Sequence, residues 1–443
     1  MENLTTFFWQ KVNYSFIKKI IQKIKSPVLL FYILSLSFYI IYVFYIHSPW
    51  QDIHIEGYID RASSLAKGSY PGKWDTFYPV GMTYILAPFF YILNYDLALR
   101  IIAIFYAVLL ATANYLVFRI VLDFYKSKTG AWLAMVFCAA YYPFIAYIGF
   151  YLSEIPFVFL LVLSMYLLCR AFNQKKSRLS TALLAGLIMG FAAIVRSTLF
   201  PAWILFLILL IIKRPLIGYK RILLFSLGFL FVVAIQTVRN SFIMERFTLF
   251  STNGGANAYL GQAHIKKVSG TPAYGGWYWY DTNCVWDKTL TKEEIFNFDG
   301  WDESKLYSKV VDLWKENPKK QILLSLQNGV DMFYLVDKHW FIFNSSASNS
   351  LNHKFQWSFV VLVYIPLVLT FVWMIKDRKS RFLNLIFMIP IISVILMAMI
   401  TKGEERYLMP FQYLMVILVA PFWGSLLLRL ITKITEKNRY RLI

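Results

Sequence analysis

Residues 50–88 read WQDIHIEGYIDRASSLAKGSYPGKWDTFYPVGMTYILAP. We infer the fold of the chain by starting from this stretch and then considering the segments on either side of it. It follows directly after an apolar run at 27–46 that is long enough to cross a membrane. It closes with Tyr-Pro-Val-Gly at 78–81 and then re-enters apolar sequence. The stretch holds four acidic residues in a chain otherwise poor in them: Asp52, Glu56, Asp60 and Asp75. We interpret it as a polar loop at one face of a bilayer.

The composition is that of a membrane protein. The chain has 443 residues, of which 58% are hydrophobic and 16% are charged. Apolar runs of about 20 residues alternate with short basic clusters, which is typical of a polytopic helical membrane protein. Backbone polar groups in hydrocarbon must be satisfied within their own segment, so each spanning segment is expected to be a helix. The alternating strands of a membrane barrel are not visible. The sequence therefore predicts an all-α polytopic membrane protein.

The net charge of +21 also fits a membrane surface. Lys and Arg bracket the apolar runs instead of forming a stripe through polar sequence. This placement is typical of the positive-inside rule and of attraction to anionic lipids. We therefore predict the lipid bilayer as a partner and no nucleic acid.

Applying the positive-inside rule gives about ten transmembrane helices, with both termini in the cytoplasm. The predicted spans are 27–46, 97–122, 130–147, 153–172, 181–196, 199–213, 222–241, 356–375, 382–401 and 407–430. Basic clusters then face the cytoplasm at 11–25, 119–128, 170–178, 213–221, 376–381 and 429–441.

Residues 80–94 are apolar but short, and they contain Pro88. They fit an interfacial or re-entrant helix, because a full span here would move the basic cluster at 119–128 to the outside. We therefore predict a first outer loop over 47–94. Residues 1–26 are basic and amphipathic, and they are expected to lie along the cytoplasmic surface.

The longest polar block, 244–355, is predicted to be a small mixed extracytoplasmic subdomain. It separates the membrane part at 27–243 from the membrane part and basic tail at 356–443. Inside the block, 301–316 carries a helical pattern, and 321–343 is expected to form a helix at the membrane interface.

Cofactor signals are absent from the sequence. The three cysteines allow at most one disulfide, and they lack metal-site spacing. His54 and His339 have no second histidine at helical spacing, so no metal and no cofactor is predicted. The Lys-rich, Cys-poor composition without a cleavable signal peptide fits a multi-pass protein of a bacterial inner membrane, and a protein of an archaeal or endoplasmic-reticulum membrane would have a similar composition.

The predicted topology gathers charged residues at the outer face. They are Asp52, Glu56, Asp75, Glu154, Arg196, Arg239 and Arg406. An ionisable group near hydrocarbon costs on the order of 2–3 kcal/mol at the bilayer centre, so such groups persist when they pair, snorkel or serve a function. The planar guanidinium of arginine can donate two parallel hydrogen bonds to phosphate oxygens, and a carboxylate can accept the proton of an attacking hydroxyl. The set suits a reaction between a membrane-held anion and a hydroxyl.

Each of these residues also has a structural interpretation. Asp52 and Glu56 share one face if their segment is helical, and either can cap or solubilise that helix. Glu154 stands where a helix dipole favours an acid, and Arg196 can snorkel to the interface. Arg406 is the stronger candidate among the arginines because Lys402 and Tyr407 flank it.

Six segments in order resemble a known class of enzyme. They are DIHIEGYIDRASSLAKG at 52–68, YPVG at 78–81, IVRSTLFP at 194–201, VRN at 238–240, STNGGANAYLG at 251–261 and ERYLMP at 405–410. The set resembles the polyprenyl-phosphate-sugar-dependent glycosyltransferases of the GT-C fold. Within that class it is most similar to the protein-mannosyltransferase and aminoarabinose-transferase-like group, glycosyltransferase family 39. The chain departs from that group in separating its two acids and in having YPVG where YPPG is common.

The resemblance implies a GT-C-like fold and an inverting transfer at the outer face. A sugar would leave a polyprenyl-phosphate carrier for a hydroxyl of a glycolipid, a cell-wall polymer or a protein. The general base would be Asp52 or Glu56, and the sequence leaves this choice open. The donor phosphate would be held by Arg406, Arg239, Arg196 and Lys402, with Glu154, Tyr78 and Tyr407 in support.

Two other functions stay open. A transporter or flippase of an anionic lipid-linked substrate would have charged or broken helices near the middle of the membrane, and two related halves. A scaffold without chemistry would tolerate changes at Asp52, Glu56 and Arg406.

Overall fold

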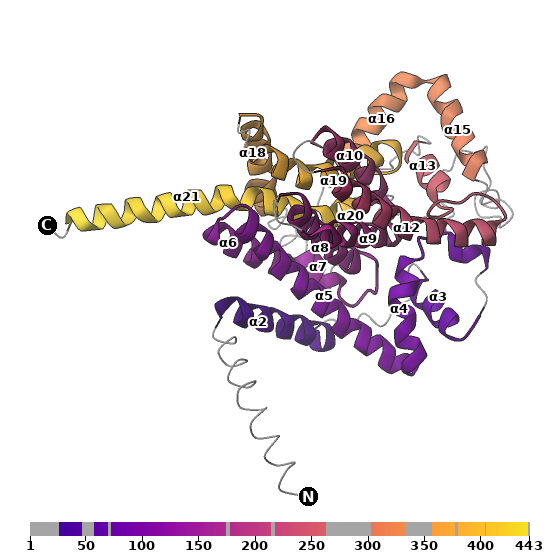
Figure 1. Cartoon of the computed structure of the whole chain (residues 1–443), viewed down its shortest axis with the longest axis horizontal. Helices are drawn as coiled ribbons and strands as arrows, with labels where there is room; N and C mark the ends of the chain where they lie inside the picture. The colour runs from indigo at the N-terminus through magenta and orange to yellow at the C-terminus, as the bar shows by residue number, and fades with distance from the viewer. Residues whose placement is uncertain are drawn as a thin grey trace, which may run out of the picture.

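The computed structural model describes residues 26–46, 57–69, 72–173, 178–213, 218–262, 303–333, 357–376, 380–403 and 405–441, and all structural statements concern these residues. Within them the chain is helical and forms no strand (Figure 1). The longer elements are α2 (Pro27–Ile41), α3 (Tyr58–Ala66), α4 (Gly81–Ile92), α5 (Tyr95–Phe124), α6 (Lys128–Ala139), α8 (Glu154–Asn173), α9 (Leu179–Val195), α10 (Phe200–Ile212), α12 (Tyr219–Met244), α13 (Gly254–Gln262), α15 (Glu303–Glu316), α16 (Pro318–Asp331), α18 (Ile365–Lys376), α19 (Arg381–Ile400) and α21 (Gln412–Arg441).

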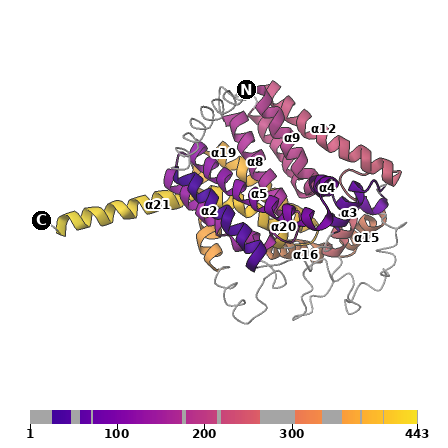
Figure 2. The same ribbon diagram turned by 90° about the horizontal axis from the view of Figure 1, so that it is seen from below.

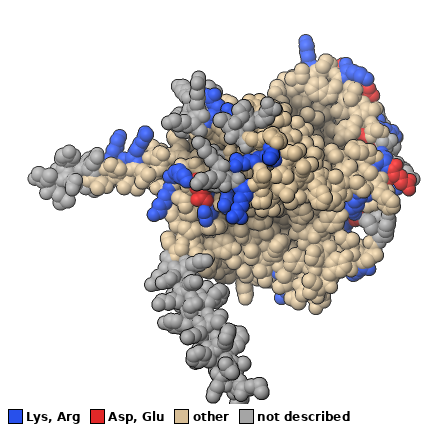
Figure 3. Space-filling view, in the orientation of Figure 1, with Lys and Arg blue, Asp and Glu red and all other residues tan. Residues whose placement is uncertain are grey.

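Six helices among the described residues are long and apolar enough to cross a membrane. They are Pro27–Tyr45, Tyr95–Phe124, Glu154–Phe172, Tyr219–Met244, Arg381–Ile400 and Arg406–Thr435. Each coincides with a span predicted from the sequence. On the face shown in Figure 3, many Lys and Arg side chains lie toward the left side or along the right edge, and much of the surface carries no charge. The protein is thus an all-helical membrane protein.

The remaining predicted spans correspond to shorter apolar helices. They are Lys128–Ala139, Leu179–Val195, Ser197–Ile212 and Trp357–Val372. Helix α4 has 12 residues. At about 1.5 Å per residue it is shorter than a hydrocarbon core of about 30 Å.

The predicted span 130–147 is not one helix. It is split into α6 and the short helix α7 (Tyr142–Tyr147). The break falls at Ala140 and Tyr141, because Pro143 has no N–H to donate to Ala139 O and its ring would clash with that carbonyl in a continuous helix. The carbonyls freed at the break are satisfied by tyrosines: Tyr39 Oη donates to Ala139 O at 2.8 Å, and Tyr413 Oη to Cys138 O at 3.2 Å.

Helices α9 and α12 make the most extensive contact of any two described helices, and they run side by side in Figure 2. Small residues allow this approach: a Cβ added at Gly186 of α9 would lie 2.0 Å from Phe225 O of α12. This packing fixes the end of α9, which is followed by Arg196.

We predict that Gly186→Ala lowers the free energy of unfolding by roughly 1–3 kcal/mol, because the added methyl forces the two backbones apart. Thermal unfolding of the purified protein in detergent measures the loss. Gly72→Ala is the matched control, since a Cβ there meets nothing within 4 Å. Equal melting temperatures for the two variants would contradict the close α9–α12 contact.

The described part of the polar block is helical, where the sequence predicted mixed structure. Helix α15 matches the helical pattern at 301–316, while α16 begins earlier than the predicted interface helix at 321–343, and 334–356 lie outside the described residues. Helices α13 and α15 pack through a small core that includes Tyr259 and Leu306.

Candidate functional site

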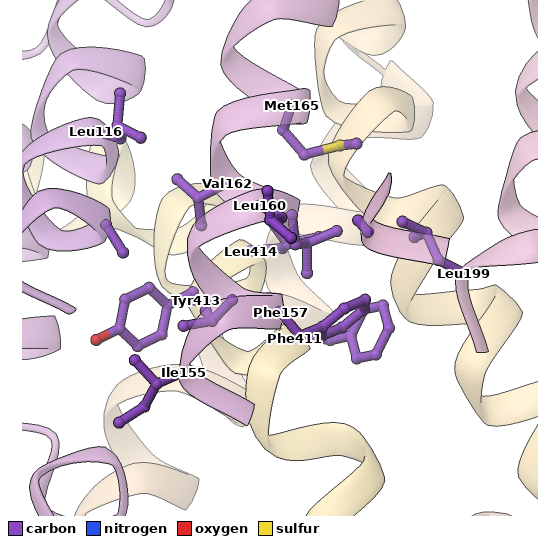
Figure 4. Close-up of a cluster of buried hydrophobic side chains, with 14 of the residues drawn as sticks. Leu116, Ile155, Phe157, Leu160, Val162, Met165, Leu199, Phe411, Tyr413 and Leu414 are labelled. Atoms are coloured by element: carbon purple, nitrogen blue, oxygen red, sulfur yellow. The ribbon is translucent and has the colours of Figure 1, made fainter. Parts of the chain in front are cut away.

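Three distant elements meet on a cluster of apolar side chains (Figure 4). Phe157 comes from α8, Leu199 ends the short helix η3 (Ser197–Leu199), and Phe411 ends η8 (Met409–Phe411). All three side chains are fully buried, and the Phe157 and Phe411 ring centroids are 5.6 Å apart. Each lies within a few residues of a predicted site residue, so their packing assembles the site from parts far apart in sequence.

Those site residues are Glu154, Arg196 and Arg406, and they form one buried ionic cluster. Arg196 Nη1 lies 2.8 Å from Glu154 Oε1, and Arg406 Nε donates to the same oxygen. Glu154 is 0% exposed, Arg196 8% and the Arg406 side chain 15%. The sequence predicted that these residues lie at one face of the membrane. The structure adds that both guanidiniums form ion pairs with the Glu154 carboxylate.

The charge of this cluster is unbalanced. Two guanidiniums face one carboxylate, so these three side chains together carry one excess positive charge. In addition, Glu154 Oε2 is buried and has no hydrogen-bond partner. Charged groups removed from water are costly unless they are paired and hydrogen-bonded. Among the described residues Glu154 Oε2 has no partner, so the arrangement is suited to a hydrogen-bond donor at this oxygen.

Aromatic rings line the cations of the cluster. The guanidinium carbon of Arg196 lies 5.6 Å from the ring centroid of Tyr407 and 5.8 Å from that of Phe157. Lys402 Nζ lies 5.9 Å from the same Tyr407 ring. Such positions favour cation–π attraction. Tyr407 thus lies near both Arg196 and Lys402, so a third predicted cation lies close to the cluster.

The first loop is docked against the end of α9. A Cβ added at Gly81 would lie 2.6 Å from Ile194 O, so the start of α4 contacts the backbone two residues before Arg196. Just ahead of α4, the guanidinium carbon of Arg61 lies 5.2 Å from the ring centroid of Tyr78 and 4.9 Å from that of Tyr58. Arg61 was not among the residues predicted for the site. Its helical spacing from Tyr58 was visible, but the approach to Tyr78 depends on the fold.

The segment at 251–261 bridges the first loop and the residues around Lys402. Thr252 N donates to Thr76 O at 2.8 Å, in the short helix η2 (Lys73–Thr76). At its other end, Gly261 O accepts from Asn328 Nδ2 at 3.0 Å, and the same amide donates to Thr401 O at 2.9 Å. The role of Asn328 was not predicted, because its partners come from distant loops.

Among the described residues, Arg239 and Asp75 do not form an ion pair with the side chains of the cluster. Arg239 Nη1 lies 2.9 Å from Asn240 Oδ1, and Arg239 is not among the ionic partners of Glu154. Asp75 lies half-buried in η2. Asp52 and Glu56 lie outside the described residues. No group of three or more His, Cys, Asp or Glu side chains that could hold a metal occurs among the described ranges.

These features define an all-helical membrane protein with a buried carboxylate–arginine cluster beside its first polar loop. Comparisons with protein-family models, curated proteins and solved structures gave no match to this chain. The function is therefore argued from the residues of the site.

Proposed function

We propose that this protein is a membrane glycosyltransferase of GT-C-like fold. It moves a sugar from a polyprenyl-phosphate carrier to an acceptor hydroxyl, with inversion at the anomeric carbon. The observation that carries the proposal is the buried cluster in which Arg196 and Arg406 both donate to Glu154, close to where α4 of the first loop contacts the end of α9. Guanidiniums held in this way suit the phosphate of a lipid carrier.

The proposal places the site outside the cell. Glu154 is the first residue of α8 and Arg170 lies in its last turn, so the cluster and a basic cluster lie at opposite ends of a helix of 20 residues. The positive-inside rule assigns the basic end to the cytoplasm. In the full topology we propose ten spans and an extracytoplasmic polar block, in a bacterial inner membrane.

In the proposed reaction, the acceptor oxygen attacks the anomeric carbon and the bond from that carbon to the phosphate oxygen breaks. The acceptor proton passes to the carboxylate of Asp52 or Glu56, and prenyl phosphate leaves. The donor phosphodiester carries one negative charge, and the leaving phosphate gains another. Guanidiniums fixed in a site of low dielectric therefore stabilise the transition state more than the bound donor.

Glu154 acts in this scheme as a positioning residue. By accepting from both guanidiniums it fixes their separation before the donor arrives, so less reorganisation is needed during the reaction. Lys402, beside Tyr407, adds a third cation for the phosphate, and Arg239 is proposed to meet the donor from α12. Tyr78, in contact with Arg61, supports the first loop beside this site.

A transfer assay tests the function. Purified protein in detergent is mixed with synthetic prenyl-phosphate sugars and with membrane extract as a source of acceptor, and release of prenyl phosphate is followed by mass spectrometry. We expect release that depends on both donor and acceptor, and none from a nucleotide sugar. In vesicles, movement of the donor between leaflets without cleavage would identify a flippase instead, and absence of any turnover would contradict the proposal.

A further inference from the structure

Helix α16 buries its polar face and exposes its apolar face. Its buried residues include Gln321, Ser325, Asn328 and Asp331, which recur at helical spacing and are all polar. Its opposite face is apolar and exposed. The exposed fractions are 50% for Ile322, 68% for Leu323, 51% for Leu326 and 55% for Val330. A helix at a water-facing surface shows the reverse arrangement, so this exposed face is not suited to water.

The buried polar face makes several hydrogen bonds inside the protein, although Gln321 Oε1 has no partner among the described residues. Gln321 Nε2 donates to Gln262 O at 3.1 Å, and Asn328 Nδ2 donates to Gly261 O and Thr401 O. These bonds fix the rotation of α16 about its axis. The helix cannot turn its apolar side inward without breaking them, so the exposed apolar residues are a permanent feature of the surface.

The apolar face of α16 lies next to a lipid-facing stripe of α19. Helix α19 is one of the six membrane-crossing candidates, and its exposed side chains recur at a spacing of four: Ile392, Leu396 and Ile400. Gly329 of α16 packs on this end of α19, where an added Cβ would lie 3.0 Å from the Met399 side chain. The apolar surface therefore continues from the spanning helix onto α16.

Charges at the start of α16 match a lipid surface. Lys315, Lys319 and Lys320 are exposed at the junction of α15 and α16. Lysines beside an apolar helix face attract anionic headgroups while the apolar face enters the boundary of the hydrocarbon.

We propose that α16 is an interfacial helix, whose face of Ile322, Leu323, Leu326 and Val330 lies in the bilayer leaflet. Through Asn328 and Thr401 it then holds the residues around Lys402 at the membrane surface. The ionic cluster is thereby kept at the level of lipid headgroups. The proposal does not depend on the glycosyltransferase reaction.

Site-directed fluorescence quenching tests it. Leu323→Cys and Leu326→Cys are made in a Cys284→Ser chain, since Cys138 and Cys169 are buried. Ser308→Cys, on an exposed position of α15, is the matched control. Each variant is labelled with bimane and reconstituted at about one protein per vesicle of phosphatidylcholine and phosphatidylglycerol.

We expect brominated-chain lipids to quench labels at 323 and 326 at least about twofold, because the label then lies among acyl chains. Iodide in the aqueous phase should quench the label at 308 and spare the other two. Iodide quenching at 323 and 326 equal to that at 308 would overturn the proposal. Protection of 323 and 326 from both quenchers would also overturn it, because a protein contact would then cover the face.

Discussion

Replacing Glu154 with glutamine is expected to lower the free energy of unfolding by about 3–5 kcal/mol, the range found when one partner of a buried ionic group is removed. The substitution preserves shape but removes the negative charge to which both guanidiniums donate. Arg196 and Arg406 would then face each other across a neutral amide in a buried site. Thermal unfolding in detergent measures the effect.

Two further variants make this result specific. Asp312→Asn breaks an ion pair with Lys315 whose side chains are 58% and 73% exposed, and it should change stability by less than about 0.5 kcal/mol. In the double variant Glu154→Gln/Arg196→Met the repulsion between guanidiniums is removed, so part of the loss should return. A Glu154→Gln protein that melts with the parent, or a double variant less stable than the sum of its single changes, would contradict the charge argument.

Removing the general base is expected to lower the rate of sugar transfer by about 10²–10⁴-fold. The candidates are Asp52→Asn and Glu56→Gln, made singly. One of the two variants should show the full loss and the other should retain most of the activity, which would identify the base. The same transfer assay with a saturating prenyl-phosphate sugar measures the rate.

Asp60→Asn is the matched control for these variants, since Asp60 is an exposed acid on α3, four residues after Glu56. It should keep the parent rate. Prenyl phosphate binding should also be unchanged in the base variants, because the base contacts the acceptor and not the phosphate. Full transfer by both Asp52→Asn and Glu56→Gln would show that neither carboxylate is the base.

Much of the membrane fold was predictable, because the length of each apolar run and the position of the basic clusters indicate where helices can cross a membrane. The sequence also placed Glu154, Arg196 and Arg406 at a common face, since each lies at the end of an apolar run. It did not reveal that Glu154 accepts from both arginines. That contact depends on the packing of Phe157, Leu199 and Phe411, which no local pattern encodes.

One predicted span was wrong for a local physical reason, and the buried face of one helix was not predicted. The split of the predicted span at 130–147 was signalled by Pro143, but the tyrosines that satisfy the freed carbonyls come from distant helices. In α16, polar and apolar residues alternate with helical spacing, and the sequence alone does not say which face is buried. The contacts of Asn328 with Gly261 and Thr401 decide it.

The central claim is that the ionic cluster binds the phosphate of a prenyl carrier, and the affinity of Arg406→Gln for prenyl phosphate tests it most directly. In this variant Glu154 keeps its pair with Arg196, so the fold is retained while the excess positive charge is lost. A hydrogen bond to a charged group contributes about 1.5–3 kcal/mol, so isothermal titration with a short-chain prenyl phosphate should show affinity reduced by about 10–100-fold. Arg119→Gln, in a pair with Asp123 away from the site, should bind as the parent does. Equal affinity of Arg406→Gln and the parent, or no binding by the parent, would contradict the account.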